Sequence, residues 1–295
     1  MNTRLLAASG LLLLACAAPA LAQEAAAPED EKLWSLSLGG GATLVSHGQD
    51  PWSTNVDLSR SIGDASLSLG YSRSTENGQQ GVPFSLGSKS ETFSLSAGYG
   101  IGSVSLDVHG SYGVRRFDGR SFRRRTGQVV TIDGKGKSYG IGATATVWVP
   151  LGENTSMSPY ASLDYSSTDT ARALVLPPIG LVSAKDKQKG TTGSLGTSID
   201  RRFGSESQHS ISANAAWVIT SNSAATSSTL IRRSGAARPL RPQAGAGGSE
   251  NWFEYGASAS FGVSDVVNLS LSASRTVGTF GPETTSLYTG VSFSF

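Results

Sequence analysis

His109 is surrounded on its own predicted strand by residue types that hydrolases use. Ser105, Asp107 and Ser111 are two or four residues from His109, so all four side chains point to one face of a strand. Nucleophilic catalysis needs a hydroxyl, a base and an orienting carboxylate within hydrogen-bond reach of one another. Residues two apart on a strand are about 6–7 Å apart at the backbone, so such a relay needs partners from neighbouring strands. We therefore expect no enzyme, and a lumenal or rim hydrolase acting on lipid is the least favoured alternative.

Other chemistries find less support in the sequence. His47 and His209 flank turns, and no two histidines have the spacing of metal ligands; we expect neither a metal site nor a cofactor. The glycines at 39–41 continue a strand pattern, so they do not form a phosphate-binding loop. The basic segments lack the interleaved aromatic residues of a nucleic-acid groove, so no nucleic-acid partner is expected.

The first 22 residues have the features of a secretory signal peptide. Arg4 precedes an apolar stretch over residues 5–18, and an Ala-Leu-Ala cleavage site ends at residue 22. Cys16, the only cysteine, lies in the apolar stretch; a lipoprotein cleavage box is the alternative, but Leu14 fits it poorly. We expect a signal peptide over 1–22, a short acidic periplasmic segment over 23–32 and one structural unit over 33–295.

Short segments of alternating apolar and small polar residues recur through the rest of the chain. In the last of them, Leu287, Thr289, Val291, Phe293 and Phe295 share one strand face, while Ser and Gly dominate the other. Twelve such strands are predicted, with ten or fourteen as alternatives. They cover residues 34–44, 52–58, 65–71, 93–99, 104–112, 139–147, 157–165, 195–203, 211–219, 253–261, 267–273 and 287–295.

The connections between these segments alternate strictly between short and long. Short links near 59–64, 100–103, 150–156, 204–208 and 262–266 alternate with long links near 75–90, 115–137, 167–189, 222–250 and 276–285 and a shorter one at 46–51. Short periplasmic turns and long extracellular loops produce this pattern in membrane barrels. The sequence therefore predicts an all-β fold, a transmembrane antiparallel up-and-down β-barrel of twelve strands in the cell outer membrane, with both termini periplasmic.

The inward face of the predicted barrel is lined mainly by serine and glycine, which leave space in a twelve-stranded ring. The few charged side chains in the inward phase are mostly acidic: Asp57, Asp107, Asp164, Asp200 and Glu254. The segment 115–137 is strongly basic, and we expect it to be a loop that enters the mouth and forms an anion-binding constriction. The residues assigned to it are Arg115, Arg116, Arg120, Arg123, Arg124 and Arg125. A solvent-exposed basic loop is an equally weighted alternative.

Two arginines in the outward phase suggest a lipid contact. Arg73 and Arg275 are placed at the predicted extracellular ends of their strands. There a guanidinium can meet the phosphates of lipopolysaccharide or extend into water. Outer-membrane lipid and lipopolysaccharide are thus the expected partners, whereas the sequence indicates neither a protein partner nor an oligomeric state.

The terminal strand resembles the closing strand of bacterial outer-membrane barrels, with Gly290, Phe293 and the terminal Phe295 as its insertion signal. The segment from Pro159 to Ser166 is similar to segments of autotransporter translocator domains. This resemblance implies a twelve-stranded barrel inserted by the barrel-assembly machinery, here without a passenger domain. The favoured function is a passive porin-like channel for small hydrophilic, possibly anionic, solutes. A plugged structural or accessory barrel that docks a partner or lipopolysaccharide is the alternative.

Overall fold

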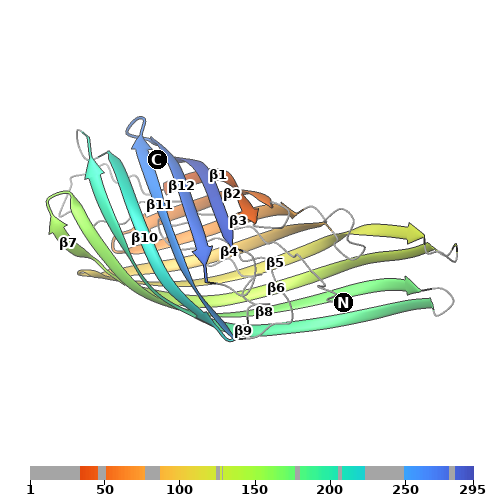
Figure 1. The fold of residues 1–295 in the computed structure, drawn as a ribbon. Coiled ribbons are helices and arrows are strands. Elements are labelled where there is room, and N and C mark those ends of the chain that lie inside the picture. Colours follow the sequence, from red (N-terminus) through yellow and green to blue (C-terminus); the bar gives the residue numbers. More distant parts are fainter. Residues whose placement is uncertain are drawn as a thin grey trace.

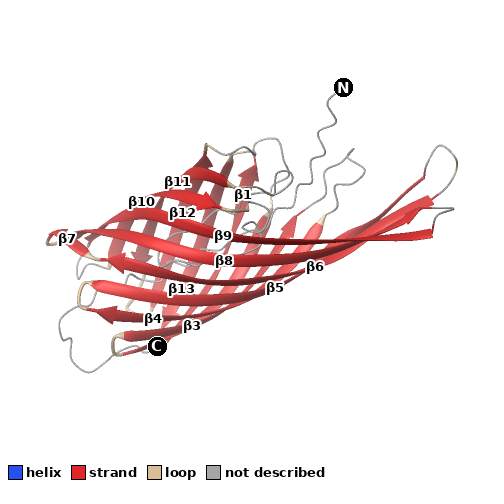
Figure 2. Cartoon of the chain, turned by 90° about the horizontal axis from the view of Figure 1, so that it is seen from below, coloured by secondary structure: helices blue, strands red, loops and turns tan. Residues whose placement is uncertain are grey.

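The protein is an all-β structure, seen here in a computed structural model (Figures 1 and 2). It describes residues 34–45, 51–76, 87–123, 127, 129–176, 180–204, 208–222, 249–278 and 283–295, so the predicted signal peptide and the segment 23–32 lie outside it. No helix capable of crossing a membrane is found among these residues. The strands are β1 (Trp34–Val45), β2 (Trp52–Ile62), β3 (Ala65–Glu76), β4 (Ser88–Ile101), β5 (Val104–Arg123), β6 (Val129–Val147), β7 (Val149–Gly152), β8 (Thr155–Leu176), β9 (Gly180–Phe203), β10 (His209–Thr220), β11 (Glu250–Gly262), β12 (Val267–Val277) and β13 (Thr284–Ser294).

The strands close into an antiparallel ring. Each strand pairs with its neighbours in the chain except that β6 pairs with β8 and not with β7, and β1 pairs with β13. The short β7 continues the line of β6 beyond Trp148 and also pairs with β8. Reciprocal backbone hydrogen bonds of 2.9 Å join Trp34 and Phe295 at the seam. The prediction of twelve strands, closed by the first and last, is therefore confirmed, with β7 as a thirteenth, supplementary strand.

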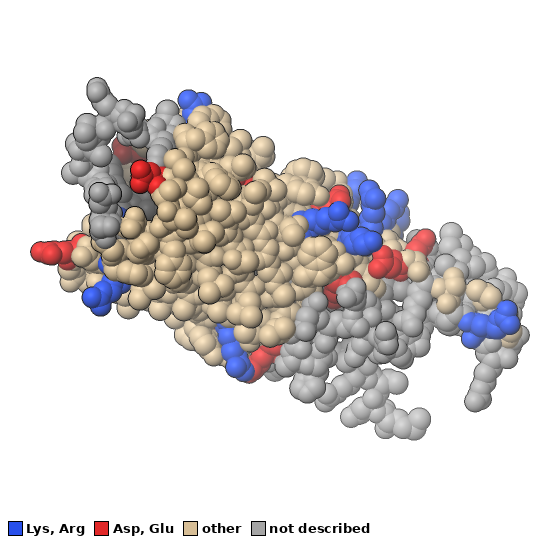
Figure 3. Space-filling model, turned by 90° about the horizontal axis from the view of Figure 1, so that it is seen from above, with Lys and Arg blue, Asp and Glu red and all other residues tan. Residues whose placement is uncertain are grey.

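The wall has an apolar outer face and a small polar inner face. On β3, for example, Leu67 and Leu69 are exposed, whereas Ser66 and Ser68 face the lumen because side chains alternate across a strand. Figure 3 shows an outer wall that is almost free of charged side chains. Such a wall suits the hydrocarbon region of a bilayer, in which every backbone polar group must be paired within the protein.

The two ends of the barrel differ. Tight turns close one end, including two whose glycines Gly63 and Gly102 take the left-handed conformation, with φ of 55° and 59°. The described ends of the chain, Trp34 and Phe295, lie at this same end, which we call the terminal rim. We call the opposite end the hairpin rim.

Four strands extend far past the hairpin rim, as Figures 1 and 2 show. Pairing of β5 with β6 continues to Arg123, and pairing of β8 with β9 continues to Leu176. The sequence predicts connecting segments over 115–137 and 167–189, and this prediction is wrong where the residues are described, because they form paired strands. A register shift between Phe117 and Arg120 interrupts β5 once, as a β-bulge does.

Candidate functional site in the barrel lumen

The lumen is divided into two zones along the barrel axis. In β1–β4 and β9–β13, inward side chains near the hairpin rim are buried, whereas those near the terminal rim are partly exposed. We call the buried set the closed belt and the other part of the lumen the vestibule. The closed belt comprises Thr43, Ser53, Asn55, Asp57, Ser72, Ser74, Glu76, Ser88, Ser90, Thr92, Thr192, Ser194, Ala216, Val218, Thr220, Glu250, Trp252, Glu254, Ser274, Thr276, Thr284, Ser286 and Tyr288.

Side-chain hydrogen bonds within and between strands satisfy much of the closed belt. Thr43 and Ser286 are joined by a bond of 2.8 Å across the β1–β13 seam. The hydroxyl of Tyr288 donates to Oδ1 of Asn55, and Nδ2 of Asn55 donates to Asp57 at 2.5 Å. Because buried polar groups without partners destabilise a fold, this network stabilises the buried inner face of the wall.

A histidine–carboxylate pair crosses one intervening strand of the wall. Nε2 of His109 on β5 lies 2.8 Å from Oδ1 of Asp164 on β8, and both side chains are buried. Gly142 on β6 lies between them in register. A Cβ atom at Gly142 would come within 2.0 Å of Asp164 Oδ1, so the contact requires a glycine at this position.

The geometry does not complete a hydrolytic relay around His109. Its carboxylate partner is Asp164 and not Asp107, the residue that shares its strand. Among the described residues no serine donates to or accepts from His109, and Oδ2 of Asp164 has no hydrogen-bond partner. The described residues also contain no group of three potential metal-binding side chains.

A second ion pair lies where the closed belt meets the extension of β5. Nη2 of Arg115 lies 2.7 Å from Oε2 of Glu76, with 14% and 4% of the two side chains exposed. Ser88 accepts from Nε and Nη2 of the same arginine, and the guanidinium lies 4.8 Å from the ring centroid of Phe117. These contacts hold Arg115 against the wall.

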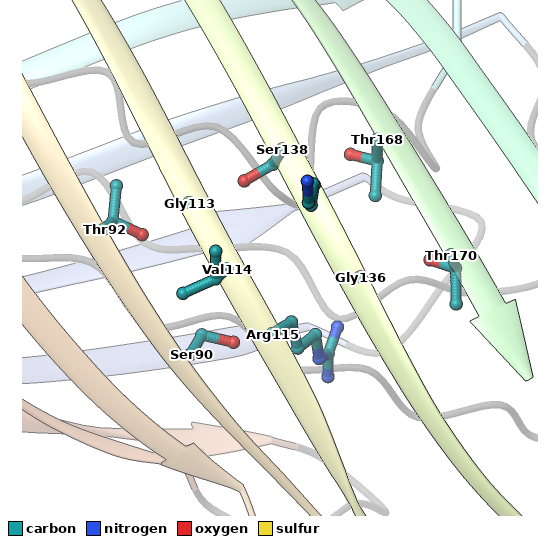
Figure 4. Close-up of a pocket in the computed structure, with 10 residues that line it drawn as sticks. Ser90, Thr92, Gly113, Val114, Arg115, Gly136, Ser138, Thr168 and Thr170 are labelled. Atoms are coloured by element: carbon teal, nitrogen blue, oxygen red, sulfur yellow. The ribbon is translucent and has the colours of Figure 1, made fainter.

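A shallow pocket next to Arg115 carries mainly hydroxyl groups. Figure 4 shows Ser90 and Thr92 on β4 facing it from one side, with Thr168 and Thr170 on β8 on the other. The hydroxyl of Ser90 is buried and has no hydrogen-bond partner among the described residues. The pocket holds no combination of acid, base and nucleophile.

An apolar cluster faces the lumen from β10 and β11. Ala216, Val218 and Trp252 are buried together, and Tyr160 packs against them. The indole nitrogen of Trp252 donates to Glu254 at 2.6 Å, which satisfies its only polar group. Apolar side chains inside a wall of serine and threonine favour a dry lumen at this level.

The lumen is acidic. All five acids assigned to it from the sequence, Asp57, Asp107, Asp164, Asp200 and Glu254, lie in the inward phase of their strands. Glu76 and Glu250 join them, so seven described carboxylates line the barrel against two arginines, Arg115 and Arg202. The described lumen thus carries an excess of negative charge.

The arginines assigned to a constriction do not gather in one place. Arg115 faces inward and is paired with Glu76, whereas Arg116 and Arg123 are exposed on strand β5. The side chain of Arg120 and the residues Arg124 and Arg125 lie outside the described residues. The constriction stays a prediction for those three.

The outward-facing candidates are placed as follows. Arg275 lies 2.6 Å from Glu283, and Arg73 lies directly opposite Glu91 in the β3–β4 register. Gly290 faces the lumen and Phe293 the outside of β13, and 62% of Phe295 is exposed at the terminal rim. The lipid contact and the insertion signal both stay predictions.

The sequence pattern did not identify several lumenal residues of the closed belt. Trp252 and Val218 are apolar but do not share the phase of the apolar outer face. Only this difference in phase identifies them as lumenal. Glu76 and Ser88 fall within a segment interpreted as a loop, so their inward phase is visible only once β3 and β4 are extended.

Comparisons with known proteins agree on the architecture. The sequence profile of the Autotransporter beta-domain family matches residues 64–274. The translocator domain of the autotransporter NalP from Neisseria meningitidis superposes with a TM-score of 0.60 at 19% identity, over 89% of this chain and 88% of that one. The beta domain of the Bordetella autotransporter BrkA gives 0.61 at 16% identity, over 89% and 99%. No curated sequence matches significantly.

Proposed function

Because this chain belongs to the Autotransporter beta-domain family, and is thus an outer-membrane β-barrel of the translocator type, we propose that it is a plugged barrel at rest. The observation that carries the proposal is the closed belt, whose side chains lose contact with water all around β1–β4 and β9–β13. A freely conducting porin keeps a polar, water-filled interior along its length. A barrel closed over half of its lumen suits an accessory or structural role.

The apolar cluster supports this proposal independently. Val218 is fully buried and Trp252 is 3% exposed, although both project from the inner face of the wall. Apolar groups of this kind oppose the entry of water and ions, since hydrophobic constrictions close channels by dewetting. The proposal therefore predicts little steady ion flux through the resting protein.

A passive channel for small hydrophilic solutes is the second candidate, and the vestibule favours it. Its walls carry hydroxyl pairs such as Ser212–Ser258 and Ser35–Ser59, each at 2.6 Å, and its side chains remain partly exposed. The seven lumenal carboxylates repel anions. A channel with these walls favours cations, which is the reverse of the preference expected from the basic segment 115–137.

The proposed placement has the terminal rim in the periplasm and the hairpin rim outside the cell. Short turns support this assignment, because barrels of this class keep short turns on the periplasmic side. On this basis both described termini are periplasmic, and the four-stranded extension of β5, β6, β8 and β9 projects from the cell surface. No enzymatic activity forms part of the proposal.

Planar-bilayer recording of the refolded protein tests the closed state. We expect small or absent conductance for the wild type, and larger cation-selective steps for Trp252→Ala because the variant opens the closed belt. Trp217→Ala is the matched control, since Trp217 is the neighbouring outward-facing tryptophan and is 48% exposed. Large steady conductance of the wild type would establish the passive channel instead.

A further inference from the structure

A row of aromatic side chains marks the outer face of the wall near the hairpin rim. Tyr71, Phe93, Tyr112 and Tyr139 are cross-strand neighbours on β3, β4, β5 and β6. The rings of Tyr71 and Phe93 are 5.1 Å apart, and those of Tyr112 and Tyr139 are 5.2 Å apart. Aromatic girdles of membrane barrels lie at the boundary between hydrocarbon and headgroups. This row therefore locates the headgroup layer.

A row of basic side chains lies four residues further along the same strands. Lys89, Arg116 and Lys135 are direct cross-strand neighbours, and Lys185 follows across Ala171. All four cations are exposed and outward-facing. Four residues of strand span about 13 Å, so the basic row lies just beyond the aromatic row. We call Lys89, Arg116, Lys135 and Lys185 the basic row.

Local acids do not neutralise the basic row. The next row toward the terminal rim holds Glu91 and Asp169, and Asp169 forms an ion pair with Lys187 at 3.6 Å. Asp118 and Asp133 lie on the other side of the basic row, toward the tips of the hairpins, and both are exposed. Among the described residues, no carboxylate forms an ion pair with a member of the basic row. Like charges directly opposite on neighbouring strands repel, so the arrangement favours an external anion.

The two arginines first considered for lipid contact are less suitable. Arg275 is held by Glu283 at 2.6 Å, and Arg73 lies opposite Glu91. Arg275 is therefore already paired with a carboxylate of the protein, and Arg73 has one directly across the neighbouring strand. Lys137 and Lys189 are also exposed on this outer surface, and the basic row is the part of it in which cations lie directly opposite one another on neighbouring strands.

We propose that the basic row binds the phosphate groups of lipopolysaccharide in the outer leaflet. Phosphates of a lipid headgroup lie immediately beyond the hydrocarbon boundary, at the level that the aromatic row assigns to the basic row. Arginine and lysine form charge-assisted hydrogen bonds with phosphate oxygens. Figure 3 shows Lys and Arg side chains gathered where the uncharged wall meets the projecting strands. The inference rests on the proposed orientation of the barrel, and not on the closed belt.

Native mass spectrometry of the refolded barrel in detergent, with purified lipid A as the probe, tests this site. The test variant is Arg116→Gln/Lys135→Gln, and the control is Arg201→Gln/Arg275→Gln, which removes the same charge from exposed positions elsewhere on the wall. We expect the wild type and the control to bind bisphosphorylated lipid A equally. The test variant should bind it on the order of tenfold more weakly, because each juxtamembrane cation attracts an anionic surface. Lys89→Gln/Lys185→Gln gives a second variant at the ends of the row if the first does not fold.

Two further ligands distinguish the phosphates of lipid A from the lipid alone and from free phosphate. Lipid A stripped of both phosphates should bind weakly to every variant, and inorganic phosphate at equal concentration should not displace the intact lipid. Equal binding of bisphosphorylated lipid A by the wild type and the folded test variant would overturn the proposal. Equal binding of the stripped lipid would also overturn it, as would displacement by inorganic phosphate. A conducting wild-type barrel would leave the proposal intact.

Discussion

The closed belt and the vestibule are built from similar residues and yet differ in their access to water. Thr276 and Thr284 share a hydrogen bond of 2.8 Å in the closed belt, and Ser212 and Ser258 share one of 2.6 Å in the vestibule. Both pairs join neighbouring strands through hydroxyls on the inner face. The first pair is buried and the second partly exposed.

Long side chains account for the difference between the two zones. The closed belt includes Trp252, Tyr288 and Glu76, the partner of Arg115, whereas the vestibule is dominated by serine and glycine. A twelve-stranded ring is too wide for small side chains alone to fill. The inner face of the wall changes from serine and glycine at the terminal rim to a mixture of hydroxyl groups and long side chains near the hairpin rim.

We expect the largest loss of stability for a substitution at Gly142. Gly142→Ala places a Cβ 2.0 Å from Asp164 Oδ1 and 2.6 Å from His109 Nε2, which drives the buried pair apart. A buried polar group left without its hydrogen-bond partner costs about 3 kcal/mol, so the midpoint of urea unfolding in lipid vesicles should fall markedly. Gly152→Ala, where nothing lies within 4 Å of the new Cβ, is the control and should unfold like the wild type. Equal midpoints for the two variants would show that the pair contributes nothing.

Two adjacent arginines offer the next contrast. Arg115→Ala leaves the buried Glu76 without its partner at 2.7 Å, and we expect a loss of about 2 kcal/mol in unfolding free energy. Arg116→Ala removes an exposed side chain on the opposite face and should change stability by less than about 0.5 kcal/mol. The same urea titrations measure both variants. An equal loss for Arg115→Ala and Arg116→Ala would mean that the buried Arg115–Glu76 pair adds nothing to the free energy of unfolding.

The sequence was sufficient to predict the ring itself. Alternation of apolar and small residues located all twelve strands, and the pairing of the Trp34 strand with the Phe295 strand followed from closure. Alternation is informative there because lipid on one side requires an apolar face. The extensions of β5, β6, β8 and β9 carry charged and small residues on their outer face, such as Asp118, Asp133 and Lys185, so the alternation disappears.

The site was less predictable because its contacts cross strands. His109 and Asp164 are 55 residues apart in the chain and meet over Gly142, which is visible only when the register of three strands is known. Trp252 was detectable in principle, since it has the wrong phase for the outer face. The inward phase of the five acids follows from their place within regular strands, whereas their role in the lumen stays a prediction.

The smallest effect is expected among the hydroxyls of the closed belt. Thr276→Val removes the hydrogen bond to Thr284 and should cost about 1 kcal/mol. Ser274→Ala on the same strand should be close to neutral, because the buried hydroxyl of Ser274 has no hydrogen-bond partner within the part of the chain that the structure describes. Unfolding free energies of the two variants provide the measurement. A larger loss for Ser274→Ala than for Thr276→Val would reveal a partner for Ser274, such as a bound water.

Thiol labelling in the lumen tests the closed belt most directly. Cys16 is the only cysteine of the sequence, so a Cys16→Ser background allows one thiol at a time to be placed on β2. Ser53→Cys puts it in the closed belt, where Ser53 is 2% exposed, and Ser61→Cys puts it in the vestibule. A small charged methanethiosulfonate should label position 61 at least about tenfold faster than position 53, because only an accessible thiolate reacts. Equal labelling rates at the two positions would contradict a lumen closed near the hairpin rim.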